Sequence, residues 1–389
     1  PPFFLHQHPA QRDAQESRGL GDVYKRQMQT YSLKCYKCNV TQNDNSISRI
    51  FCEKGCNELL ICEDISPMKQ DPLQSMRDDE KSFSLGEGST PLIPLNNIGK
   101  RLGLEKLFAK LEFMSPTGSF KDRGSSLVIN IARKERVAEF VEDSSGNAGA
   151  SLSAYAGATD IKAHIFVPDS AGKGKLDQIS IFGAKLHKIE GPRENSTIAA
   201  KDFSKKNNIP YLSHNLSPYF SEGMKSFAYE IYSEFGEVDH IIFPTGNGSL
   251  LLGTWRGFID ISENSNLSLP KLHAAQSSII EPIVAEFSQK KWNFDPSSKT
   301  IASGISVSNP PRLIEIVDAI KNSDGSATSS SDNEALIWHE ILAKEEGIYS
   351  EKTCAFPFAT LEKLVKSGII KKNEKIIIPI TGSGLKEST

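Results

Sequence analysis

The segment "SPTGSFKDRG" (residues 115–124) places a lysine, Lys121, directly behind a Gly-Ser turn and at the start of a helical pattern. The positive end of the helix dipole disfavours a cation at such a position. A lysine held there loses part of its preference for the charged form, which favours a role as a nucleophile. The alternative is a solvated basic residue near a helix end. Lys121 is therefore the first candidate for a functional residue.

Short β-rich apolar runs alternate with helical stretches on both sides of this segment. Such alternation over about 300 residues predicts an α/β fold whose parallel sheets are covered by helices on both faces. The expected strands are 106–114, 139–144, 162–168, 185–190, 240–246, 271–276 and 375–382. The expected helices include 121–136, 147–157, 173–182, 195–206, 221–235, 331–346 and 355–367.

The composition is that of an ordinary folded protein. The chain has 389 residues, of which 38% are hydrophobic and 24% charged, and its net charge is −3. This near-neutral balance gives no electrostatic reason to expect nucleic acid or an anionic membrane as a partner. No apolar run approaches the roughly 20 residues needed to span a bilayer. We therefore expect a cytoplasmic protein that acts on a small molecule.

Three of the expected strands end in turns rich in glycine, serine, threonine and asparagine. In open α/β sheets, ligands bind beyond the carboxyl ends of the strands, so these turns are candidates for one site. The turn "TGNGSLLLG" (245–253) could form an anion cradle from backbone N–H groups and a helix N-terminus, or it could be a plain tight turn. It lacks the Gly-Lys-Ser/Thr of nucleotide hydrolases, and Leu251 breaks the G-x-G-x-x-G pattern.

The other two turns, "SSGNAGAS" (144–151) and "TGSGLKE" (381–387), add polar side chains. Ser144 or Ser145 is a good helix N-cap, but capping does not explain Asn147, whose amide is exposed by the small residues around it. Thr381 places a hydroxyl at the end of a buried strand. A lysine, an anion cradle, an amide and a hydroxyl together indicate pyridoxal phosphate, held as a Schiff base.

These motifs resemble, in the same order along the chain, those of the tryptophan synthase β-like, or fold-type II, pyridoxal-phosphate enzymes. The likeness is strongest to threonine synthases. The segments "GEGSTPLIPL" (86–95), "VPDSAGKGKLDQISIFGAKL" (167–186) and "KEEGIYSE" (344–351) also resemble that family, so the likeness covers about residues 82–387. It implies a two-subdomain α/β catalytic domain at 67–389, whose smaller, mobile subdomain is at about 122–215.

By this resemblance, Lys121 forms the Schiff base, Asn147 bonds the phenolic oxygen of the cofactor and Thr381 bonds its pyridine nitrogen. Ser144 and Ser145 take the substrate carboxylate. A neutral hydroxyl at the ring nitrogen makes a weaker electron sink than an aspartate would, which suits elimination and replacement better than transamination. Lys121 then acts as the base for the α-proton. The backbone that holds the phosphate is that of Thr245, Gly246, Asn247, Gly248, Ser249 and Leu250.

The implied activity is that of a threonine synthase, a lyase that converts O-phosphohomoserine and water to threonine and phosphate, with a homodimer as the family expectation. One position departs from the family pattern, because Phe220 replaces an arginine thought to hold the substrate phosphate. Lys225, or the hydroxyls of Ser217 and Ser221, would then have to compensate. The alternatives are a dehydratase or cysteate-synthase-like enzyme on a serine-type substrate, and a non-catalytic metabolite-binding protein. The intact Lys121 argues against a binder, which needs no activated amine.

Five of the six cysteines lie near the N-terminus. In a reducing compartment such clustering suggests a metal rather than disulfides. The candidate ligands of a tetrahedral zinc form two pairs, Cys35-x2-Cys38 and Cys52-x3-Cys56. Cys62 could replace a member of the second pair, and the alternative is a reduced, metal-free remnant. We expect a zinc-ribbon-like unit at 28–66, which the resemblance suggests is structural.

The first 27 residues differ from the rest of the chain. They show neither a periodic pattern nor the apolar core of a secretory signal, and their end resembles translated adapter sequence. Met28 would be a natural start. We interpret residues 1–27 as a non-native or disordered tail; a genuine transit peptide is the alternative.

Overall fold

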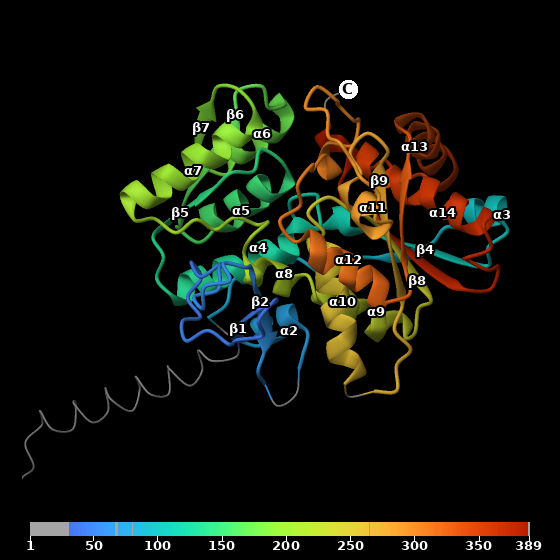
Figure 1. Ribbon diagram of the computed structural model, residues 1–389, viewed down its shortest axis with the longest axis horizontal. Helices are drawn as coiled ribbons and strands as arrows, with labels where there is room; N and C mark the ends of the chain where they lie inside the picture. Colours follow the sequence, from blue (N-terminus) through green and yellow to red (C-terminus); the bar gives the residue numbers. More distant parts are fainter. Residues whose placement is uncertain (1–30, 67–68, 80, 264, 388–389) are drawn as a thin grey trace, which may run out of the picture.

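The computed structural model describes residues 31–66, 69–79, 81–263 and 265–387. The interpretation of residues 1–27 falls on a segment outside the described residues. Figure 1 shows two lobes side by side, with a small N-terminal unit below their junction. None of the helices in the described ranges combines the length and the apolar character that crossing a membrane requires.

The larger lobe is built on a six-stranded sheet of order β10-β9-β8-β11-β4-β3, parallel throughout except for the pair β3–β4. Its strands are β3 (Leu92–Pro94), β4 (Lys106–Lys110), β8 (His240–Pro244), β9 (Lys271–Ser277), β10 (Ser326–Ser330) and β11 (Lys375–Pro379). Ile241 and Phe243 of β8 pack into one core and Ile242 into another, so both faces of the sheet are buried. Burial of both faces is typical of parallel sheets covered by helices on both sides.

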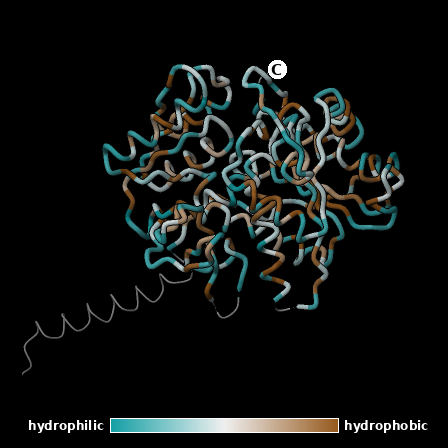
Figure 2. The backbone as a smooth tube through the Cα atoms, in the orientation of Figure 1, coloured by the Kyte–Doolittle hydropathy of each residue, from teal (hydrophilic) through white to brown (hydrophobic). Residues whose placement is uncertain are grey.

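The helices of this lobe divide between the two faces of the sheet. Trp338 and Phe356 belong to the core that contains Ile242, and Leu250 and Ile316 belong to the core that contains Phe243. Figure 2 shows the hydrophobic stretches in the interior and hydrophilic loops at the edge. The helices are α3 (Asn96–Leu102), α9 (Ser226–Phe235), α10 (Ser249–Ser262), α11 (Pro282–Phe287), α12 (Leu313–Asn322), α13 (Asp332–Glu346) and α14 (Phe356–Lys366).

The smaller lobe has a parallel three-stranded sheet of order β5-β6-β7. Its strands are β5 (Glu139–Glu142), β6 (Lys162–Pro168) and β7 (Lys185–Ile189), and its helices are α5 (Asn147–Gly157), α6 (Lys173–Ile181) and α7 (Arg193–Asn207). Tyr211 continues this sheet through a parallel bridge to Val141. All of these elements lie within the range expected for the smaller subdomain.

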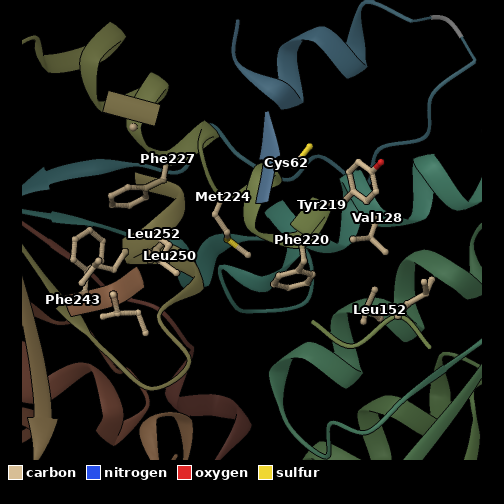
Figure 3. Packing of buried hydrophobic residues seen from close by; sticks show 14 of the residues in the cluster. Cys62, Val128, Leu152, Tyr219, Phe220, Met224, Phe227, Phe243, Leu250 and Leu252 are labelled. Carbon is tan, nitrogen blue, oxygen red and sulfur yellow. The ribbon is translucent and has the colours of Figure 1, made fainter. Parts of the chain in front are cut away.

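The two lobes meet at helices α4 (Lys121–Lys134) and α8 (Pro218–Gly223). The contact is close because Gly124 has no side chain: a Cβ there would lie 2.7 Å from the carbonyl oxygen of Phe220. Phe220 is fully buried, and Figure 3 shows its ring between Met224 and Val128. The helix expected at 221–235 is two helices in the structure, α8 and α9, which Met224 and Lys225 separate.

The N-terminal unit consists of an antiparallel pair, β1 (Tyr31–Cys35) and β2 (Leu60–Asp64), followed by α2 (Pro72–Arg77). It contacts both lobes. Glu135, at the end of α4, accepts a hydrogen bond from the backbone N–H of Ile47 at 2.8 Å, and Tyr36 donates to Asp318 of α12 at 2.5 Å. The unit therefore joins elements that lie far apart in the sequence.

Candidate active site

Lys121 is the first residue of α4, as the sequence predicts. Phe120 precedes it, and the ring centroids of Phe120 and Phe220 lie 4.5 Å and 5.7 Å from the Lys121 Nζ. Among the described residues, none forms an ion pair or hydrogen bond with this amine. Burial lowers the pKa of Lys121 to about 8. The side chain is therefore closer to the neutral, nucleophilic form than an exposed lysine would be.

A cavity of about 410 Å³ opens beside Lys121, between the two lobes. It lies at the carboxyl ends of β5, β8 and β11, where the three predicted turns converge. The backbone N–H of Phe120 donates to Thr381 at 3.2 Å, and Ser119 bridges to Gly382. The predicted residues that line the cavity are Lys121, Ser144, Ser145, Asn147, Thr245, Gly246, Asn247, Gly248, Ser249, Leu250 and Thr381.

The turn after β8 forms a backbone cradle on the cavity wall. Helix α10 begins at Ser249, and its N-cap, Gly248, has φ +71. A Cβ at Gly248 would also lie 2.4 Å from Ile316, so the position needs glycine for both conformation and space. Within the described part of the chain, the backbone N–H groups from Gly246 to Leu250 have no acceptor. Free N–H groups at a helix N-terminus suit an anion.

Asn147 and Glu351 form a polar pair that lines the same cavity. The Asn147 Nδ2 donates to both carboxylate oxygens of Glu351 at 3.1 Å, while the Asn147 Oδ1 is buried with no partner among the described residues. Lys175 of α6 lies 3.2 Å from the same carboxylate. Glu351 is 2% exposed, so these partners provide the contacts that a buried charge requires. Glu351 and Lys175 were not among the predicted site residues.

Thr381 follows β11 and is buried at the base of the cavity. Its Oγ1 lies 3.4 Å from the Sγ of Cys354. Burial raises the pKa of the Cys354 thiol to about 11, which is the behaviour of a small buried residue rather than of a nucleophile. The hydroxyl of Thr381 is thus held in place by a neutral neighbour.

Lys225 does not lie in this cavity, which corrects its assignment as a substrate-binding residue. It is 3% exposed, and its Nζ lies 2.9 Å from Glu222 and 2.7 Å from Asp260. Burial alone would lower the pKa of Lys225, but the two carboxylates raise it above the ordinary value for lysine. The sequence placed Lys225 near the site because it follows Phe220 closely, but the turn between α8 and α9 directs it toward α10.

The cavity is also lined by three residues that were not predicted as site residues, His214, Arg193 and Lys386. His214 follows the short extended segment beside β5, and Arg193 begins α7. Arg193 makes no ion pair or hydrogen bond with any described residue, so its guanidinium is available to an anion. Lys386 lies within the predicted turn 381–387, whereas none of the motifs described above contains Arg193 or His214.

The four predicted cysteines come together in the N-terminal unit. All four Sγ atoms lie within 4.8 Å of one another, and the pairs Cys35–Cys56 and Cys38–Cys52 are 3.4 Å and 3.7 Å apart. Ligands about 2.3 Å from a tetrahedral zinc lie roughly 3.8 Å from each other, so the donor set fits this metal. Cys62, on β2, lies outside the cluster and is therefore not a replacement ligand.

The cavity also fits the cofactor that the sequence indicates. Its free N–H groups match a phosphate, its lysine has a lowered pKa, and the unpartnered Asn147 Oδ1 marks a place where a polar ligand is expected. The hydroxyl of Thr381 supplies a neutral hydrogen-bonding group at the base of the cavity. All of these groups line one cavity.

Comparison with known proteins gives the same result. Residues 83–382 match the sequence profile of the pyridoxal-phosphate dependent enzymes. The chain is 35% identical to a threonine synthase of Methanocaldococcus jannaschii over 80% of this chain and 78% of that protein, and 30% identical to one of Methanosarcina acetivorans over 92% of each. Among solved structures, a maize serine racemase superposes with a TM-score of 0.70 at 21% identity, covering 80% of this chain and 93% of that one. The chain therefore belongs to the pyridoxal-phosphate dependent enzymes of fold-type II and is a pyridoxal-phosphate dependent lyase.

Proposed function

We propose that this protein is a threonine synthase, which converts O-phosphohomoserine and water to threonine and phosphate. The observation that carries the proposal is the cavity itself, which combines a lysine of lowered pKa and a phosphate cradle with a further free cation, Arg193. The cradle suffices for the phosphate of the cofactor, so Arg193 is available to a second phosphate, on the substrate. The threonine synthases of 30–35% identity support the same reaction.

Each wall of the cavity would have a separate task. The bound cofactor supplies the electron sink for elimination at the amino acid. Ser144, Ser145 and the N-terminus of α5 would receive the substrate carboxylate, because their polar groups face the cavity at the positive end of that helix. Lys121, whose pKa burial lowers to about 8, would take the α-proton on its Nζ. The two lobes exclude water from the buried side of Lys121 through the rings of Phe120 and Phe220.

A second candidate is β-elimination or β-replacement on a serine-type substrate. Two observations favour it: Phe220 is fully buried where the family carries an arginine, and Lys225 is held in ion pairs outside the cavity. Neither residue can hold a substrate phosphate. Under this alternative, Arg193 would bind another anionic group or remain solvated.

The two candidates are separated by kcat/KM values for O-phosphohomoserine, serine and threonine. A threonine synthase turns over O-phosphohomoserine fastest and releases threonine and phosphate. Arg193→Gln should then raise the KM for O-phosphohomoserine by about one to two decades, since a charged hydrogen bond contributes about 1.5–3 kcal/mol. Lys205→Gln, at the other end of α7, is the matched control and should change nothing. Faster turnover of the unphosphorylated amino acids would refute the threonine synthase assignment.

We also propose that Cys35, Cys38, Cys52 and Cys56 bind one structural zinc. Their Sγ separations suit a tetrahedral site, and the N-terminal unit contacts both lobes, so the metal would stabilise the junction. Elemental analysis should find about one zinc per chain, as expected of a four-ligand site. Cys38→Ser should lose it, whereas Cys62→Ser should keep it. A metal-free wild type with unimpaired stability would refute the zinc site.

A further inference from the structure

His214 and Glu142 form a buried pair on the small-lobe side of the cavity. The Nδ1 of His214 lies 2.6 Å from the Oε1 of Glu142, and the backbone N–H of His214 donates to the Oε2 at 3.0 Å. Glu142 is fully buried, and His214 is 6% exposed and lines the same cavity as Lys121. The roles described so far do not use this pair.

The fold places the two residues side by side at the functional edge of the small sheet. Glu142 is the last residue of β5. The segment before His214 runs parallel to β5, since the backbone N–H of Leu212 donates to Val141 and the N–H of Val141 donates to Pro210, each at 2.9 Å. Both residues therefore stand at carboxyl ends, where ligands bind in such sheets.

The surroundings determine where the protons of the pair lie. Burial raises the pKa of Glu142 well above its ordinary value, and burial together with Lys121 and Arg193 lowers the pKa of His214 well below its own. A neutral carboxyl group then donates to Nδ1, and the remaining imidazole proton is on Nε2. Within the described residues, Nε2 has no hydrogen-bond partner. The titratable groups around the ring are Glu142 from β5, Lys121 from α4 and Arg193 from the start of α7.

Phe220 connects this pair with the lysine. Its ring centroid lies 5.8 Å from that of His214 and 5.7 Å from the Nζ of Lys121. The amine and the imidazole thus lie beside the same apolar ring, and both residues line the same cavity. The arginine expected at position 220 would have added a positive charge beside both groups.

We propose that His214, with Glu142 behind it, donates the proton to the oxygen that leaves the substrate side chain. This inference rests on one part of the proposed function, namely that an oxygen leaving group is eliminated from an amino acid. The bond between carbon and the leaving oxygen breaks while Nε2–H gives its proton to that oxygen. The carboxyl proton of Glu142 moves to Nδ1, which leaves a carboxylate and a neutral imidazole. The α-proton passes to Lys121 and returns through solvent to restore the pair.

The effect of the acid on the elimination rate should depend on the leaving group. Hydroxide is a poor leaving group, so loss of water from serine needs a proton donor, whereas chloride leaves 3-chloroalanine without one. Both substrates give pyruvate and ammonia, which allows one assay for both. His214→Gln should lower kcat for serine by about 10²–10⁴-fold, the usual effect of general acid catalysis, and leave the rate with 3-chloroalanine nearly unchanged.

Two further variants separate chemistry from structure. Glu142→Gln keeps the size and hydrogen bonds of the side chain but cannot pass a proton, so it should show the same selective loss even if His214→Gln folds poorly. The matched control is His164→Gln on β6, because His164 forms a similar pair with Glu139 at 3.0 Å, at the other end of β5 and outside the cavity. It should behave as wild type with both substrates.

The protonation state provides a readout apart from activity. In holoenzyme labelled with 15N-histidine, the His214 imidazole should be neutral at pH 7 with its proton on Nε2. An imidazolium, or a proton on Nδ1 alone, would overturn the proposal. The proposal would also be overturned if His214→Gln lowered the rates with serine and 3-chloroalanine equally, or did not lower the rate with serine. It would likewise be overturned if the wild type did not eliminate water from serine. If O-phosphohomoserine is not a substrate but the variants still lose activity selectively with serine, the threonine synthase assignment fails and this inference stands.

Discussion

Lys121 and Lys225 are both surrounded by protein, yet the structure gives them opposite environments. Lys121 faces the cavity with two aromatic rings beside it and without a carboxylate partner among the described residues. Lys225 lies between Glu222 and Asp260. Burial lowers the pKa of Lys121 to about 8, whereas the carboxylates raise the pKa of Lys225 against the effect of burial. An unpaired lysine is poised for chemistry, and a paired one serves structure.

The comparison also explains how each region tolerates its charges. The Lys225 region contains Glu222, Asp260 and Lys69, so buried charges of both signs lie in contact. The Lys121 region has an open wall of backbone N–H groups instead, which is suited to receive an anion from outside. The Lys225 region pairs its charges within the protein, whereas the Lys121 region leaves its backbone N–H groups and the Asn147 Oδ1 without a partner among the described residues.

The largest expected effect is that of removing the unpaired lysine. Lys121→Ala should lower the rate of elimination by at least about 10²–10⁴-fold, because the base for the α-proton is lost. Initial rates at saturating substrate and cofactor would measure the loss. Lys134→Ala, at the exposed end of the same helix, is the control and should retain wild-type rates. Wild-type turnover by Lys121→Ala would remove this residue from the mechanism.

Removing the paired lysine should affect stability rather than chemistry. Lys225→Met leaves the buried carboxylate of Glu222 without its cation and Asp260 with Lys69 alone, and breaking a buried pair in this way costs about 3–5 kcal/mol. Urea denaturation would show the loss, while the KM for O-phosphohomoserine should not change in the folded protein. A double variant with Asp260→Asn should recover part of the stability. A selective rise in KM without a loss of stability would restore Lys225 as a substrate ligand.

The smallest expected effect is a difference in pH dependence between the two lysines. In the cofactor-free protein, Lys121 is deprotonated in the folded state but still protonated in the unfolded state between pH 8 and 10.5. Because the unfolded state then binds more protons, the contribution of Lys121 to the free energy of unfolding rises with pH across this window. Lys225 has the opposite sign: its stabilising contribution is complete below the ordinary lysine pKa of 10.5 and is lost as pH rises from there through its raised pKa. Urea midpoints of wild type and Lys121→Met at both ends of the window would test this. A constant difference between them would contradict the lowered pKa.

Much of the fold follows from local sequence patterns. The helix expected at 147–157 is present with the same bounds, and the strand at 162–168 is also unchanged. The edge strand β10 was not predicted because "SATSS" (326–330) has the composition of a loop, and its strand conformation depends on pairing with β9. Local propensity cannot reveal a strand whose partner lies about fifty residues away.

The site residues that lie in local sequence motifs were predictable, whereas those brought to the site by contacts between distant segments were not. Lys121, Asn147 and the cradle lie in recognisable turns, and the cavity contains them all. Glu351 and His214 face the same cavity only because segments distant in sequence converge on it. Lys225 was misplaced for a related reason, since its orientation depends on the break between α8 and α9 and on Asp260.

The central claim, that Lys121 is the reactive amine and Lys225 a structural cation, has one direct test. Borohydride reduction of the holoenzyme, followed by proteolysis and peptide mass mapping, identifies the lysine that carries the cofactor. The cofactor mass should be found on the peptide that contains Lys121, with the Lys225 peptide unmodified. Attachment to Lys225 or to another lysine, with Lys121 left free, would contradict the account.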